Sequence, residues 1–240
     1  MENTKQDLLD VNDDDISSFK EKFSHFLRRT GKSYATSNLN YLTDRNIKNR
    51  LLQSLQAYLP DGSIIAGGFA LSVVNEDKNA KDIDIFFTGK KAFQDTLELF
   101  LNPPEDDDAW AFKGYSHVDE SEIKDSSRYV ALKHNTRPSI QLMKMVWYED
   151  ASHVIDSFDF TISQFAFTNN SFVYNGEAMM DLARKRLVLH RMQFPASTLR
   201  RLIKYASKGY YACPGSLINI CEAIQKFNGS PDVNDVVYVD

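Results

Sequence analysis

The sequence KDIDIFF at residues 81–87, which follows the pair Gly67-Gly68, decides the fold of this chain. Polar and apolar residues alternate along it, and its apolar residues are β-branched or aromatic, so the pattern predicts a β-strand. Successive side chains of a strand point to opposite faces. Asp82 and Asp84 are therefore expected on one face, and the two isoleucines on the other.

Two carboxylates on one face of a strand repel each other, and a divalent cation relieves that repulsion. Mg²⁺ prefers one or two carboxylates together with substrate phosphates, so Asp82 and Asp84 are candidate ligands of Mg²⁺ or Mn²⁺. Gly67 and Gly68 follow an apolar run and precede a predicted helix over residues 69–74. Glycines there let the backbone approach a phosphate at a helix N-terminus. The alternative is an ordinary turn followed by an edge strand with solvated acids.

The arrangement resembles the nucleotidyltransferase superfamily typified by DNA polymerase β, whose signature is a GG or GS turn, a short helix and a strand with DxD. DFTISQFAF at 159–167 is similar to the DFTINAxAY motif of tRNA nucleotidyltransferases, the CCA-adding enzymes. GEAMMDL at 176–182 resembles their GxxDL segment, and LRRLIKYASKGY at 199–210 resembles their LLRAxRFAxxxGF helix. The motifs stand in the family's order, and the resemblance extends from about Ile64 to Tyr211.

The resemblance implies an α+β fold, a nucleotidyltransferase-like mixed sheet flanked by helices, with helical additions at both ends. It implies that Asp82 and Asp84 are catalytic and hold the metal. A third catalytic candidate is Asp159. The nucleotide-binding residues that it implies, for the phosphates and the sugar pocket, are Gly67, Gly68, Thr161, Arg201 and Lys204.

Several residues depart from the family's pattern. Ser157 and Phe158 stand where the family has two arginines, and Ser163 replaces its Asn. The base-reading EDxxR segment aligns with residues 194–198, which contain neither an acid nor an arginine, and the long helical body is missing. The strand at 139–143, where a third carboxylate is expected, has Gln141 instead. These differences support the fold and a nucleotide pocket but argue against CCA addition itself.

Composition restricts the class of protein. The chain has 240 residues, a net charge of −5 and 42% hydrophobic residues, as in an ordinary globular protein without a wholesale basic surface. Its two cysteines, Cys213 and Cys221, are predicted to be reduced and buried. No signal peptide and no membrane-spanning run is evident, so the expected location is the cytoplasm of a bacterial or phage-infected cell.

The pattern along the chain predicts three parts: an acidic segment with helices over residues 1–60, a core over 61–192, and a helical segment with a tail over 193–240. Ile47 is expected to face inward from a helix at 44–58, together with Leu51, Leu52 and Leu55. The acidic run at 105–108 is predicted to be a solvated loop, with a metal role as the alternative. Other predicted helices cover 16–27, 91–101, 151–158, 177–185, 197–208 and 215–227, and other strands 128–133, 139–146, 161–167, 172–174 and 187–189.

Basic residues are frequent near the C-terminus. They could contact a triphosphate or an RNA backbone, and the alternative is a solvated basic face. Arg201, Lys204 and Lys208 share one helical face. The whole set is Arg184, Lys185, Arg186, His190, Arg191, Arg200, Arg201, Lys204 and Lys208.

These observations favour metal-dependent transfer of a nucleotide from a nucleoside triphosphate to an acceptor hydroxyl, on an RNA 3′ end or on a protein. One alternative is a nucleotidyltransferase fold that has lost catalysis and acts as a binding or structural protein, for instance in a virus. A second alternative is a toxin that modifies tRNA or a host protein.

Overall fold

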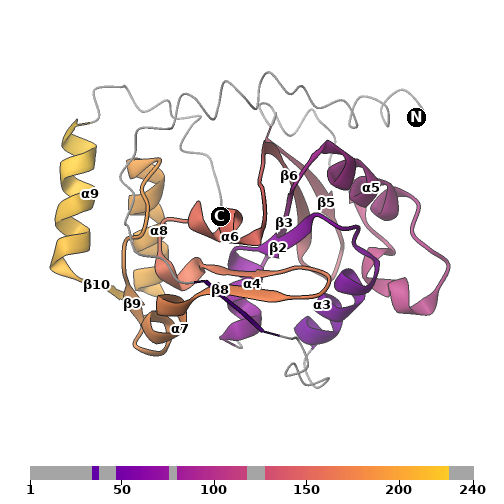
Figure 1. Ribbon diagram of the computed structural model, residues 1–240, viewed down its shortest axis with the longest axis horizontal. Helices are drawn as coiled ribbons and strands as arrows, with labels where there is room; N and C mark the ends of the chain where they lie inside the picture. Colours follow the sequence, from indigo (N-terminus) through magenta and orange to yellow (C-terminus); the bar gives the residue numbers. More distant parts are fainter. Residues whose placement is uncertain (1–33, 38–46, 76–79, 118–127, 227–240) are drawn as a thin grey trace.

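The computed structural model of the protein describes residues 34–37, 47–75, 80–117 and 128–226 (Figure 1). The helix predicted at 16–27 and the tail predicted from Pro231 lie outside these ranges, and only the backbone is described for 34–37. The described elements, in chain order, are β1 (Tyr34–Ser37), α3 (Ile47–Tyr58), β2 (Ser63–Ala66), α4 (Gly68–Val74), β3 (Asp82–Phe87), α5 (Lys90–Leu101), η1 (Asp107–Phe112), β4 (Ser116–His117), β5 (Tyr129–Lys133), β6 (Ser139–Trp147), α6 (Ala151–Asp156), η3 (Thr161–Ser163), β7 (Phe165–Phe167), β8 (Phe172–Asn175), α7 (Gly176–Ala183), β9 (Arg186–Leu187), α8 (Pro195–Ser207), β10 (Tyr211–Ala212) and α9 (Pro214–Lys226).

Eight of the described strands form one mixed sheet in the order β1-β8-β7-β2-β3-β6-β5-β4. The β3–β6 pair is parallel, and the other neighbours in this sheet are antiparallel. β3 is therefore an interior strand, paired on both edges. Asp84 of β3 lies opposite Ala66 of β2 and Gln141 of β6.

The two faces of the sheet are covered differently. On one face, Ile83, Ile85 and Phe87 of β3 are 0% exposed and belong to the main hydrophobic core, which also includes the apolar faces of α3, α4 and α5. On the other face, Phe86 belongs to a smaller cluster with Val154 and other residues of α6. The alternation of β3 thus directs Ile83, Ile85 and Phe87 into the larger core, and Asp82 and Asp84 to the face that α6 only partly covers.

Short polar side chains begin several helices. The Asp150 carboxylate accepts a hydrogen bond from the His153 amide at 2.9 Å at the start of α6, and Asn175 accepts one from the Glu177 amide at 3.0 Å at the start of α7. Such caps satisfy amides that have no partner inside the helix. They set the point at which the chain leaves the sheet and enters each helix.

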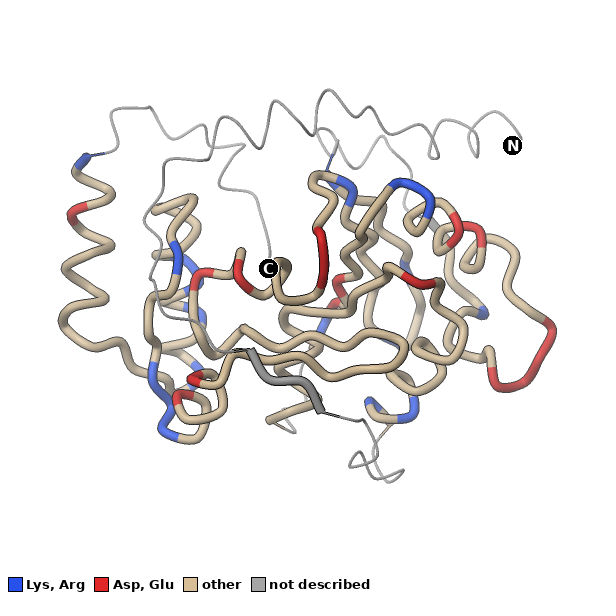
Figure 2. The backbone as a smooth tube through the Cα atoms, viewed as in Figure 1, with Lys and Arg blue, Asp and Glu red and all other residues tan. Residues whose placement is uncertain are grey.

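The segment after β8 forms the end of the molecule on which α8 and α9 lie side by side (Figure 1). β9 and β10 pair in parallel and join α7 to this end. Lys and Arg are frequent on the α7–β9 turn and on α8 (Figure 2). Within the described part of the chain, no helix is long and apolar enough to cross a membrane.

The prediction of a strand over 161–167 is wrong at its start. Residues Thr161–Ser163 form the 3-10 helix η3, and the strand β7 begins at Phe165. Gln164 explains the break, because its fully buried side chain donates to the Ile155 carbonyl at 2.9 Å and accepts from Asn175 at 2.6 Å. A regular strand would not satisfy this buried amide. The strand predicted at 187–189 is displaced as well, since β9 covers Arg186–Leu187.

Two predictions of burial are also wrong. Ile47, the first residue of α3, is 73% exposed, whereas Leu51, Leu52 and Leu55 are buried as predicted. Cys213 and Cys221 are free, as predicted, but exposed. α9 packs through Ser216 and Ile220, and helical periodicity places Cys221 on another face. Cys213 precedes α9 and lies 3.3 Å from the Ser216 hydroxyl.

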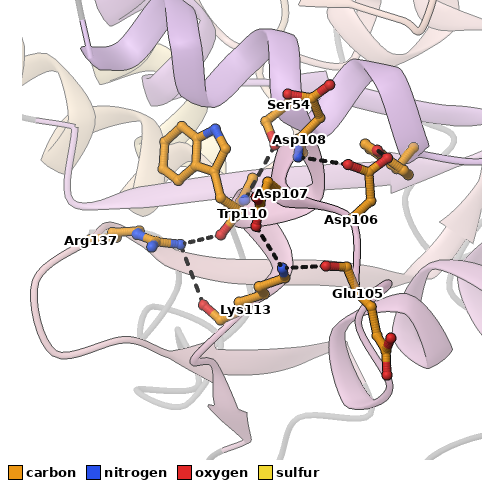
Figure 3. Close-up of polar contacts among 10 residues, drawn as sticks. Ser54, Glu105, Asp106, Asp107, Asp108, Trp110, Lys113 and Arg137 are labelled. Carbon is orange, nitrogen blue, oxygen red and sulfur yellow. Dashed lines mark hydrogen bonds and ion pairs between the residues drawn. The ribbon is translucent and has the colours of Figure 1, made fainter.

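The acidic run at 105–108 forms a structured connection into η1 (Figure 3). Asp106 accepts a hydrogen bond from the Asp108 amide at 3.0 Å, and the Lys113 ammonium donates to the Glu105 carbonyl at 3.0 Å. Arg137 from the β5–β6 turn stacks over the Trp110 ring of η1 and donates to the Trp110 carbonyl at 2.7 Å. No group of three or more potential ligands among the described residues could hold a metal ion.

Candidate functional site

Asp82 and Asp84 lie on the same face of β3. Ile83 and Ile85, which alternate with them, are 0% exposed in the core on the opposite face. Asp82 and Asp84 are themselves partly exposed to solvent. β3 is an interior strand, so its backbone is held by β2 and β6 on both sides. The two acids therefore stand on a rigid support.

Gly67 places a turn directly against Asp84. Its φ of 78° lies in the left-handed region that favours glycine. A Cβ added at Gly67 would lie 2.7 Å from the Asp84 Oδ2, whereas one added at Gly68 would meet no atom within 4 Å. Gly67 is thus required both by its backbone conformation and by its closeness to Asp84, and Gly68 is exposed beside it.

The charges of two cationic side chains of α8 act on Asp84. The pKa of Asp84 is raised from 3.8 to about 7, mainly by burial and also by the charge of Asp82, while Lys204 and Arg201 act in the opposite direction. Cations that lower the pKa of a carboxyl must lie close to it. The charges of two side chains of α8 therefore act on a carboxylate of β3, although the two elements are far apart in the sequence.

Asp159 contacts α8 through a cation and a hydroxyl. Its side chain is 7% exposed, its Oδ2 accepts a hydrogen bond from Thr198 Oγ1 at 3.0 Å, and it forms an ion pair with the Arg201 guanidinium. Thr198 and Arg201 are one turn apart on α8. Asp159 thus fastens α8 to the segment that follows α6.

Thr161 points into a second polar cluster. It is 0% exposed, and its hydroxyl donates to the Asp181 Oδ2 at 2.7 Å. The other oxygen of Asp181 lies 3.6 Å from the Arg186 Nε. The structure therefore surrounds Thr161 with protein, and it places Asp82, Asp84, Gly67, Arg201 and Lys204 around one site.

Gln141 of β6 lies opposite Asp84 in the parallel register. A neutral amide thus occupies the neighbouring position on the same face of the sheet. One strand further, on β5, Tyr129 has a pKa that is raised by its burial and by the charges of Asp82 and Asp84. The polar face therefore extends from β3 across β6 to β5.

Sequence reasoning did not identify two contacts beside the site. Ser163 and Tyr205 share a hydrogen bond of 2.9 Å, and the Tyr205 ring packs edge-on against Phe160. His190 Nε2 lies 2.8 Å from the Asp156 Oδ1 in a buried pair. Only the departure of Ser163 from the family's Asn gave a signal. The residues of each pair are distant in sequence, so no local spacing connects them.

The residues present fit a divalent cation that also binds phosphate. Asp82 and Asp84 supply two carboxylates on one face, and Mg²⁺ is commonly held by one or two carboxylates with substrate oxygens. The raised pKa of Asp84 reflects its burial and the charge of Asp82, and a cation would compensate both. Arg201 and Lys204 provide positive charge suited to the phosphates of such a ligand.

We expect Asp84→Asn to be more stable than the parent at alkaline pH, and about equal to it near pH 4, when both are kept in EDTA. Asp84 has its pKa raised from 3.8 to about 7, so the native state retains a proton that the unfolded chain loses. The parent's free energy of unfolding therefore falls as pH rises from about 4 to about 7. The variant has no such dependence at this position.

The gap should reach about 2 kcal/mol, roughly half of what three pKa units represent, because the site is partly solvated. Urea unfolding at pH values from about 4 to about 8 measures it. A gap that stays constant over this range would show that Asp84 titrates normally.

A family model described as "Gabija anti-defense 2 family protein" matches residues 17–185. A protein of Bacillus phage SPbetaL7, "Gabija anti-defense 2", is 25% identical over 181 residues, which are 72% of this chain and 41% of that protein. The chain thus spans less than half of this relative's length. The family match contains Gly67, Asp82 and Asp84 and ends before α8.

Solved structures of CCA-adding enzymes resemble the chain. The Thermotoga maritima CCA-adding enzyme complexed with tRNA has a TM-score of 0.52 at 13% identity, over 80% of this chain and 46% of that one. A CCA-adding enzyme with ATP has a TM-score of 0.53 at 17% identity, over 80% and 46%. A complex with CTP has a TM-score of 0.53 at 14% identity, over 80% and 47%. At these identities the likeness shows the fold, and it confirms the predicted nucleotidyltransferase-like α+β architecture.

Proposed function

We propose that this chain, which belongs to the Gabija anti-defense 2 family, binds a nucleoside triphosphate with Mg²⁺ or Mn²⁺ and transfers a nucleotide to an acceptor hydroxyl. The observation that carries the proposal is the pair of carboxylates on one face of β3 beside Gly67, with two cations of α8 near enough to lower the pKa of Asp84. Carboxylates suit a metal and cations suit phosphates.

The proposed roles follow from the geometry. Asp82 and Asp84 hold the metal, which supplies charge stabilisation at the reacting phosphate when it is bound. The Gly67–Gly68 turn offers backbone approach without a side chain, and Arg201 and Lys204 neutralise the remaining phosphate charge. Phosphoryl transfer of this kind depends mainly on positioning and electrostatics, which a rigid interior strand can provide.

The acceptor is proposed to be an RNA 3′ end or a protein hydroxyl. Structural neighbours in complex with tRNA, CTP and ATP share the fold, and this supports nucleotide and RNA ligands as a class. The family description and the phage relative further suggest the setting, which is opposition to the Gabija defence in a phage-infected bacterial cell.

We expect a nucleoside triphosphate with Mg²⁺ to stabilise the protein against heat. Ligand that binds only the native state adds RT ln(1 + [L]/Kd), roughly 2.7 kcal/mol when its concentration is about 100 times Kd. For a chain of this size, 1 kcal/mol corresponds to about 2–4 °C. The melting temperature should therefore rise by roughly 5–10 °C at millimolar ATP, CTP, GTP or UTP with Mg²⁺ or Mn²⁺. If the melting temperature is unchanged with all four triphosphates, that result counts against a nucleotide pocket.

One observation favours a second candidate function, nucleotide binding without transfer. Gln141 stands beside Asp84 on β6, where a third carboxylate would help to activate the attacking hydroxyl. In this alternative the protein acts by binding a nucleotide or a partner. A melting shift with nucleotide, together with no transfer to RNA, protein or small hydroxyl acceptors, would identify it.

A further inference from the structure

Asp159 forms one of two similar clusters, each made of a buried aspartate, a buried threonine and a partly exposed arginine. Asp159 accepts a hydrogen bond from Thr198 at 3.0 Å and pairs with Arg201. In the other cluster, Asp181 accepts one from Thr161 at 2.7 Å and lies 3.6 Å from Arg186. The two aspartates are 7% and 5% exposed.

The arginines of the two clusters, Arg201 and Arg186, lie near different groups. Arg201 lies close enough to lower the pKa of Asp84, and Arg186 is not among the charges that act on Asp84. Arg186 instead lies near Cys213 at the start of α9, where it helps to lower the pKa of the thiol after the larger effect of Ser216. The Asp159 cluster therefore borders the carboxylate site, and the Asp181 cluster does not.

The Asp159 backbone is itself held firmly. Its carbonyl oxygen accepts hydrogen bonds from the His190 amide at 2.7 Å and the Arg191 amide at 3.2 Å. The His190 ring is in turn fixed by the buried carboxylate of Asp156 at 2.8 Å. Asp159 thus has a fixed position from which to orient a side chain of α8.

We propose that Asp159 and Thr198 are positioning residues that hold the Arg201 guanidinium toward the phosphates of the nucleotide, an inference that rests on the proposed function. Arginine has five N–H donors, and the ion pair with Asp159 engages the Nη1 group, so the remaining donors are available to a phosphate. An arginine side chain loses rotamer entropy when it is immobilised. The ion pair with Asp159 immobilises the Arg201 side chain before the ligand arrives, so ligand binding does not require this loss of entropy.

The first test measures the affinity for inorganic triphosphate with Mg²⁺ by calorimetry, the condition in which the proposed function has the phosphates bind. Asp159→Asn should weaken binding about tenfold, as expected for a charge-assisted contact. Thr198→Val should weaken it a few-fold, and Thr198→Ser, which keeps the hydroxyl, should match the parent. The matched control is Asp181→Asn, which removes an equally buried carboxylate and should leave the affinity unchanged.

The second test follows the modification of individual arginines by phenylglyoxal with peptide mass spectrometry. Asp159→Asn should speed modification of Arg201 and leave Arg186 as in the parent, and Asp181→Asn should do the reverse. This readout needs no ligand, so it tests whether Asp159 holds Arg201 even if the parent binds no triphosphate. Absence of triphosphate binding by the parent would overturn the proposed phosphate site, and with it the role assigned to Asp159 and Thr198.

Three other results would overturn the inference alone. They are unchanged triphosphate affinity in Asp159→Asn, equal loss of affinity in Asp181→Asn, and an Arg201 that reacts no faster in Asp159→Asn than in the parent. If Asp159→Asn does not fold, the comparison of Thr198→Val with Thr198→Ser decides, since equal triphosphate affinity in these two variants would overturn the proposal.

Discussion

Asp82→Asn and Asp84→Asn are each expected to lower nucleotide transfer by on the order of a thousandfold, because several kcal/mol of metal-dependent stabilisation is lost and each 1.36 kcal/mol is a factor of ten. The folded state should survive. Both side chains are partly exposed, and neither contributes apolar packing. Transfer is measured by incubating the protein with labelled triphosphates, Mg²⁺, and total RNA or cell protein, and by following pyrophosphate release.

The matched control is Asp95→Asn. Asp95 is a half-exposed carboxylate on α5, where it pairs with Lys91, and α5 packs on the opposite face of the sheet from Asp82 and Asp84. This control should retain full transfer. If Asp84→Asn retained it too, the strand carboxylates would not be the metal ligands.

The same variants test the biological setting. Expression of the parent in bacteria that carry the Gabija defence should restore phage plaque formation, as the family description suggests. If nucleotide chemistry is the means, Asp84→Asn should not restore it. A variant that restores plaques in full would favour action by binding alone.

Gly67→Ala is expected to have the second largest effect, on both stability and transfer. Gly67 has a φ of 78°, and a new Cβ would lie 2.7 Å from the Asp84 Oδ2. A non-glycine residue in this strained region costs roughly 1–3 kcal/mol. Asp84 must also move to admit the methyl group, so we expect transfer to fall at least about tenfold, since misplacement by about 1 Å can be costly.

Gly68→Ala is the matched comparison. A Cβ there meets no atom within 4 Å, and Gly68 is the first residue of α4. Stability should stay equal or rise by up to about 1 kcal/mol, since alanine favours a helix. If the Gly68 backbone approaches the phosphate, the added methyl group obstructs that approach, and Gly68→Ala should bind triphosphate more weakly than the parent. Equal stability of the two variants by urea unfolding would contradict the account of Gly67.

Local patterns predicted the central part of the fold because they depend on the period of one element. Alternation at 81–87 placed Asp82 and Asp84 on one face and the isoleucines in the core, as the structure shows. The order of the motifs predicted the nucleotidyltransferase-like fold, which the solved structures confirm. Periodicity failed where long-range contacts prevail: it put a strand at Thr161, where the buried amide of Gln164 needs partners from two other segments.

The sequence by itself determined the strand, its paired carboxylates and the glycine turn, because each follows from side-chain alternation or backbone freedom within a few residues. Only the tertiary structure decided that Arg201 and Lys204 of α8 come near enough to Asp84 to lower its pKa. It alone decided that the Asp159 carboxylate faces Arg201 instead of standing free. The physical reason is that charges act through space, and the distance between two segments depends on how the whole chain packs.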